Sequence, residues 1–107
     1  MDMVMRFDVY LVSLDPTKGS EIKKTRPCLI ISPDEMNKGL NTVLIAPMTT
    51  ALRHYPTRVK MTFQSKKGDI ALDQIRAIDK ERLIKKLGSI HPVAARNTLS
   101  VLQEMFS

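Results

Sequence analysis

Helical periodicity is confined to the C-terminal end of this sequence, and that restriction limits the folds open to the chain. From Pro92 onward, apolar residues recur at the spacing of one helix face, at Ala95, Leu99, Leu102 and Phe106. Earlier segments alternate apolar with polar residues or form brief apolar runs, which are patterns of β-strands. Strands are expected at residues 7–14, 27–31, 42–48, 57–63, 69–72, 75–78 and 85–90. The sequence therefore predicts a mainly β fold, a strongly curved sheet or small barrel with a C-terminal α-helix packed against it.

Two residues have the features of helix starts. Ser32 precedes Pro33 and two acidic residues, so Ser32 is expected to cap a one-turn helix with Pro33 as its first residue. His91 stands directly before Pro92, and a role at the start of the last helix fits it better than catalysis.

Length and composition favour one small intracellular domain. The 107 residues suffice for one core but not for two, and no repeat or linker divides them, so residues 1–107 are treated as a single domain. The lone Cys28 excludes a disulfide within the chain and a cysteine-rich zinc site. No apolar run approaches the roughly 18 residues of a membrane span. The N-terminal segment contains the acidic residues Asp2 and Asp8 and lacks the apolar run of a secretory leader. A cytoplasmic protein without membrane contact is expected.

The net charge of +6 is concentrated in the middle of the sequence. No acidic residue lies between Glu35 and Asp69, where the basic residues are Lys38, Arg53, Arg58, Lys60, Lys66 and Lys67. In the strand expected at 57–63, Arg58 and Lys60 point to the same face, which is predicted to be exposed. Two interpretations stay open: a solvated face that maintains solubility, or a surface that contacts the phosphates of a polyanion.

The motifs of metal-dependent or histidine-based catalysis are missing from the sequence. It has no phosphate-binding glycine loop, CxxC or HExxH motif, and its two histidines, His54 and His91, lie far apart. No cluster has the spacing of metal ligands, so neither a metal ion nor another cofactor is expected. The polar motifs that remain are Gly19-Ser20-Glu21, Thr25-Arg26-Pro27, Pro47-Met48-Thr49-Thr50 and Leu72-Asp73-Gln74.

In this order, the four motifs resemble the MazF/PemK/Kid family of toxin endoribonucleases, and the likeness covers nearly the whole chain. It also includes Asp8-Val9-Tyr10, Tyr55-Pro56-Thr57 and Ile75-Arg76-Ala77-Ile78-Asp79. The resemblance implies an SH3-like barrel of the CcdB/PemK type, a homodimer, and metal-independent, sequence-specific cleavage of single-stranded messenger RNA. It further implies a growth-inhibiting toxin whose cognate antitoxin would place an acidic, extended tail in the RNA groove.

The resemblance also implies roles for individual residues. The usual catalytic pair of the family, an arginine before proline and a threonine, matches Arg26 and Thr49, and the glutamate of Gly-Ser-Glu matches Glu21. A planar guanidinium suits phosphate oxygens, and a threonine hydroxyl can donate to the same phosphate. Glu21 is the candidate base, although an exposed carboxylate is a weak base for a 2′-hydroxyl. The residues expected to bind RNA are Gly19, Ser20, Thr50, Arg58, Lys60, Asp73 and Gln74.

Two other functions remain open at this point. A CcdB-type toxin shares the fold but poisons DNA gyrase through a tryptophan in its C-terminal tripeptide. This chain has no tryptophan and ends Met105-Phe106-Ser107. A non-catalytic SH3-like nucleic-acid-binding module would use Arg26 and Thr49 for binding only, and an RNA cleavage assay distinguishes it from a nuclease.

Overall fold

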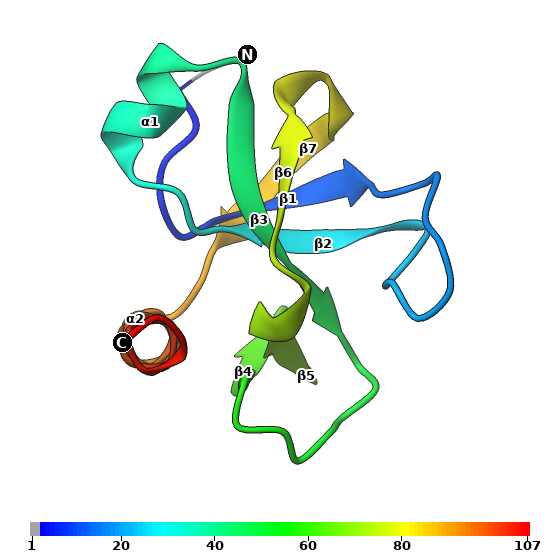
Figure 1. The fold of residues 1–107 in the computed structure, drawn as a ribbon, viewed down its shortest axis with the longest axis vertical. Coiled ribbons are helices and arrows are strands. Elements are labelled where there is room, and N and C mark those ends of the chain that lie inside the picture. Colours follow the sequence, from blue (N-terminus) through cyan, green and yellow to red (C-terminus); the bar gives the residue numbers. More distant parts are fainter. Residues whose placement is uncertain (1–2) are drawn as a thin grey trace.

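A curled antiparallel sheet with a helix against it makes up the computed structural model, which describes residues 3–107 (Figure 1). The strands are β1 (Asp8–Ser13), β2 (Thr25–Ile30), β3 (Thr42–Thr49), β4 (Arg58–Phe63), β5 (Lys66–Ala71), β6 (Arg76–Asp79) and β7 (Leu83–Ser89). The helices are α1 (Asp34–Gly39), the 3₁₀ turns η1 (Leu72–Gln74) and η2 (Lys80–Arg82), and α2 (Pro92–Met105). The mainly β fold with a C-terminal helix, expected from the sequence, is confirmed.

Strand β3 joins the parts of the sheet. The strand order is β4-β5-β3-β2-β1-β7, and β6 also pairs with β3. Residues Thr42 to Ile45 of β3 pair with β6, whereas its last two residues, Met48 and Thr49, pair with β5. Because one long strand changes partners along its length, the β4–β5 hairpin is turned relative to the other strands, and the sheet curls.

Apolar side chains fill both faces of the curled sheet. Val9 and Leu29 belong to a core cluster that also contains Ala94 and Ala95 of α2, while Val12 and Ile30 belong to a second cluster. Each fully buried aliphatic side chain of this kind stabilises the fold by about 1.5–3 kcal/mol. No helix within residues 3–107 is long and apolar enough to span a membrane.

The two expected helix starts have different outcomes. His91 caps α2 as predicted, because its Nδ1 accepts a hydrogen bond from the Val93 N–H at 3.1 Å. The prediction for Ser32 is wrong: Pro33 occupies the cap position of α1, and no side chain in the described part of the chain makes a capping hydrogen bond there. Ser32 is buried, and its hydroxyl instead donates to the side chain of Asn37 and accepts from the backbone N–H of Leu44.

The hairpin between β4 and β5 positions the end of β3. Its turn is made by Gln64 and Ser65, both at positive φ, and Lys66 is the first residue of β5. Gly68 is required where β5 meets β3, because a Cβ at this position would lie 2.6 Å from the backbone oxygen of Thr49. Glycine therefore allows the close approach that holds Thr49 in the sheet.

Candidate active site

Arg26 and Thr49 lie at the same end of the β2–β3 strand pair. Cys28 is opposite Pro47 in this antiparallel pair. Arg26 lies two residues before Cys28 and Thr49 lies two residues after Pro47, so both are displaced toward the same end of the pair. Arg26 is half-buried, and its Nε donates to the backbone carbonyl of Lys23 at 3.0 Å. The Thr49 Oγ1 accepts from the Ala51 N–H at 3.1 Å, which leaves the hydroxyl proton for donation to a ligand.

Glu21 is held by a turn of the β1–β2 loop, which lies on the side of the sheet away from α2 (Figure 1). Its Oε1 accepts from the Lys18 N–H at 2.6 Å, and its own N–H donates to the Lys18 carbonyl at 3.1 Å. Gly19 within this turn has φ +55°, a conformation that costs glycine little. The Gly-Ser-Glu motif is therefore an exposed local turn with the carboxylate folded back on its own backbone.

Gln74 holds this loop against η1. Its Oε1 accepts from the Ile22 N–H at 2.6 Å, and its Nε2 donates to the Ser20 carbonyl at 3.2 Å. The two bonds hold the backbone on both sides of Glu21. The structure thus brings Ser20 and Gln74 together, and the amide that was expected to bind RNA holds the loop.

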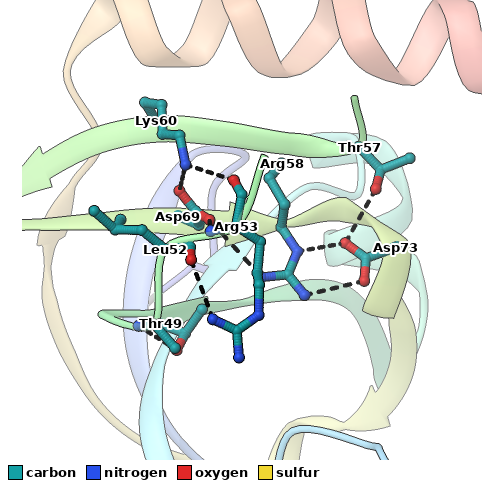
Figure 2. Close-up of polar contacts among 9 residues, drawn as sticks. Thr49, Leu52, Arg53, Thr57, Arg58, Lys60, Asp69 and Asp73 are labelled. Carbon is teal, nitrogen blue, oxygen red and sulfur yellow. Dashed lines mark hydrogen bonds and ion pairs between the residues drawn. The ribbon is translucent and has the colours of Figure 1, made fainter. Parts of the chain in front are cut away.

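The guanidinium of Arg58 is buried in an ion pair (Figure 2). Its Nε and Nη2 donate to the two carboxylate oxygens of Asp73 at 2.6 and 3.2 Å, and only 7% of the side chain is exposed. The hydrogen bond to Asp73 raises the pKa of Arg58. Partial burial alone would raise the pKa of Asp73, but bonds from Arg58 and Thr57 lower it below its ordinary value. The expectation that Arg58 is an exposed cation is wrong.

Lys60 is more exposed than Arg58 but is also paired. Its Nζ donates to Asp69 Oδ1 and to the Arg53 carbonyl, both at 2.7 Å. Sequence reasoning missed Asp69, which is fully buried and also accepts from the Arg53 N–H at 2.8 Å. The hairpin register contains the signal, because it places Lys60 directly opposite Asp69. Thr50 is exposed just after β3.

Thr49 lines two clefts. One of about 480 Å³ separates the β1–β2 loop from the segment between β3 and β4, and Ser20, Thr49 and Arg53 are among its lining residues. A smaller cleft of about 210 Å³ is lined by Thr49, Thr50 and Pro27, the residue next to Arg26. Glu21 lines a neighbouring cleft of about 390 Å³ together with Ser20. Within residues 3–107, no hydrogen bond or ion pair joins the side chains of Arg26, Thr49 and Glu21 to one another.

Other reactive groups in the described part of the chain offer no alternative centre. Residues 3–107 contain no group of three or more His, Cys, Asp or Glu side chains placed to hold a metal ion. Cys28 is fully buried, as predicted, and burial raises the pKa of its thiol to about 12 despite the nearby charges of Arg26 and Arg76. A thiol with so high a pKa is not a nucleophile near neutral pH.

The sequence over residues 5–106 matches the family described as PemK-like, MazF-like toxin of type II toxin-antitoxin system. The chain belongs to this PemK/MazF family of toxin endoribonucleases. The Endoribonuclease MazF of Staphylococcus epidermidis is 42% identical over 91 residues, which cover 79% of this chain and 76% of that protein. The family resemblance and the endoribonuclease class expected from the motifs are therefore confirmed.

Solved structures of the PemK/MazF family have the same fold. MazF from Deinococcus radiodurans superimposes with a TM-score of 0.86 at 19% identity, covering 99% of this chain and 98% of that one. A mycobacterial endoribonuclease solved in complex with its cognate antitoxin superimposes with a TM-score of 0.81 at 25% identity, covering 96% and 94%. The likeness thus extends over essentially the whole of the curled sheet and α2.

Proposed function

We propose that this chain cleaves single-stranded messenger RNA without a metal ion, using the 2′-hydroxyl of the RNA as the nucleophile. The 2′-oxygen attacks the adjacent phosphorus and the bond from phosphorus to the 5′-oxygen breaks. The products carry a 2′,3′-cyclic phosphate and a 5′-hydroxyl. The observation that carries the proposal is the position of Arg26 and Thr49 at one end of the β2–β3 pair, where Thr49 borders two clefts.

Arg26 supplies the charge that stabilises the transition state. Its bond to the Lys23 carbonyl uses Nε, so both Nη groups remain for the oxygens of a phosphate. The Thr49 hydroxyl donates to the same phosphate: its oxygen accepts from the Ala51 N–H, and its proton remains for the ligand. Donors fixed in this way before the reaction are the largest single contribution to many such rate enhancements.

Glu21 is the proposed acceptor of the 2′-hydroxyl proton. Its Oε1 is occupied by the Lys18 N–H, so Oε2 is the atom left for the proton. The departing 5′-oxygen takes a proton from water, which balances the step. The two hydrogen bonds of the Gln74 side chain support this role, because they fix the backbone on both sides of Glu21.

Cleavage should persist when divalent metal ions are removed. Purified protein incubated with a long single-stranded RNA in excess EDTA is expected to give the same fragments at nearly the same rate as in magnesium, because Arg26 and Thr49 stabilise the phosphate directly. Mapping of the 5′ ends checks the result and reveals the cleavage sequence, which bases entering the clefts would determine. Loss of cleavage in EDTA with recovery in magnesium contradicts the mechanism.

The partner is proposed to be a cognate antitoxin with an acidic, extended segment. The net charge of +6 supports an anionic partner. The mycobacterial relative solved with its cognate antitoxin supports an antitoxin as that partner. As the toxin of such a pair, the chain would act in the cytoplasm, where messenger RNA is available, and would arrest growth when the antitoxin is absent.

A homodimer is expected in solution. Half-buried Met61 and Phe63 line the cleft beside Thr49, and such partly exposed apolar surface favours association. Size-exclusion chromatography with light scattering should give twice the chain mass of 12.1 kDa, about 24 kDa, at micromolar concentration. A monomer under these conditions contradicts the dimer and any RNA groove formed between subunits.

A further inference from the structure

Two side chains of the β4–β5 hairpin hold a single residue of the loop that precedes it (Figure 2). The N–H of Arg53 donates to Asp69 Oδ2 at 2.8 Å, and the carbonyl of Arg53 accepts from Lys60 Nζ at 2.7 Å. Lys60 Nζ and Asp69 Oδ1 are themselves 2.7 Å apart. Both backbone hydrogen-bonding groups of Arg53 are therefore fixed by one ion pair.

The ion pair is built into the hairpin. Asp69 is fully buried, and a buried carboxylate is tolerated only when charges and hydrogen bonds compensate it. Lys60 lies opposite it across the two strands, and Arg58 Nη1 lies 3.8 Å from Oδ2. Since the strand pairing sets this arrangement, the position of Arg53 follows from the hairpin and not from the loop sequence alone.

The basic side chains of the hairpin and of the loop before it differ in whether a carboxylate lies close to their charge. Arg58 and Lys60 each lie within 4 Å of a carboxylate. Within residues 3–107, the Arg53 guanidinium has no carboxylate at ion-pair distance, and its Nη1 donates to the neighbouring Leu52 carbonyl at 3.1 Å. Arg53 is exposed and lines the 480 Å³ cleft together with Thr49. Its charge is thus uncompensated beside a candidate catalytic residue.

We propose that Arg53 binds a phosphate of the RNA next to the scissile one, and that Asp69 and Lys60 are the residues that position it. The inference rests on the proposed function, because that function supplies the polyanion. It reassigns Arg58 and Lys60, which sequence reasoning placed on the RNA, to the support of the loop. Arg53 and Thr49 contact the substrate, whereas Asp69 acts only through Arg53.

The salt dependence of binding tests the role of Arg53. The probe is a single-stranded 2′-O-methyl RNA of mixed sequence, which lacks the nucleophile, and its Kd is measured by fluorescence anisotropy at several salt concentrations. Arg53→Gln should flatten the slope of log K against log salt by about 0.7, the value for one contact to a single strand. The control Arg96→Gln removes an equal charge from an exposed site on α2 and should leave the slope unchanged. An Arg53→Gln slope equal to wild type overturns the proposal.

The positioning role of Asp69 is tested by whether Asp69→Asn strengthens or weakens RNA binding. Asp69→Asn removes a negative charge, so electrostatics alone would tighten RNA binding. If Asp69 positions Arg53, binding becomes weaker instead, and the weakening disappears when Arg53→Gln is already present. Tighter binding, or equal weakening in both backgrounds, contradicts the role.

If the melting temperature shows that Asp69→Asn does not fold, Lys60→Gln takes its place in the test. The weakening of RNA binding by Lys60→Gln should also vanish when Arg53→Gln is present, whereas an additive effect would make Lys60 itself a phosphate contact. Cleavage of unmodified RNA by the wild type is measured in parallel. A wild type that cuts RNA while the Arg53 variants bind normally refutes this inference alone, and a wild type that cuts nothing refutes the proposed function.

Discussion

Replacing Arg26 with alanine should lower the rate of RNA cleavage roughly a hundredfold or more, because loss of one preorganised donor to a transition-state oxygen costs about 3–4 kcal/mol. Among the residues that the structure describes, the Arg26 side chain makes one hydrogen bond, to the Lys23 carbonyl. Loss of such a bond lowers the free energy of unfolding by about 0.5–1.5 kcal/mol, so the fold should persist. Single-turnover cleavage of a fixed RNA and the melting temperature measure the two effects separately.

Arg26→Lys separates charge from geometry at the same position. Lysine keeps the positive charge but lacks the planar fork that donates to two phosphate oxygens at once, so activity should stay well below that of wild type. In cells, induction of the wild type should stop growth and induction of Arg26→Ala should not. A well-folded Arg26→Ala variant that cleaves RNA at the wild-type rate would show that the catalytic assignment is wrong.

Local sequence signals were sufficient for most of the fold. Period-two alternation located β1 and β4, and the apolar stripe after His91 located α2 and its cap. The sequence predicts the wrong role for Ser32, because its hydroxyl forms hydrogen bonds with the Asn37 side chain and the Leu44 N–H instead of capping α1. The bond from Leu44 exists only once β3 is packed beside this segment. Phe106 continues the helical spacing but lies past the end of α2, and 76% of it is exposed.

The site was predictable where the function depends on a linear motif and unpredictable where it depends on pairing across strands. Arg26 and Thr49 were found by their motifs, and the strand register places them at one end of a strand pair. The sequence predicts an exposed Arg58, because its partner Asp73 lies 15 residues further along the chain and is brought to it by η1. Asp69 marked the end of the acid-free stretch, and its role follows from a hairpin register that composition does not reveal.

A single 2′-deoxy sugar at the cleavage position should abolish cutting there. Attack by the 2′-oxygen is the first bond-forming step of the proposed mechanism, and neither Arg26 nor Thr49 can supply another nucleophile, because both serve the phosphate. Binding should be nearly unchanged, since each phosphate keeps its charge and most of the affinity of such complexes comes from phosphate contacts. The effect is on chemistry alone, and it is expected to be complete within the detection limit of the assay.

The measurement uses two RNAs of identical sequence that contain the mapped cleavage site, one all-ribose and one with 2′-deoxyribose on the 5′ side of the scissile phosphate. Both are incubated with the wild-type protein in EDTA. The mechanism predicts that the all-ribose RNA yields a 5′-hydroxyl fragment and a 2′,3′-cyclic or 3′-phosphate fragment, while the substituted RNA binds with similar affinity and stays intact. Cleavage of the substituted RNA at the same position, or a 5′-phosphate on the all-ribose product, would show that the 2′-hydroxyl is not the nucleophile.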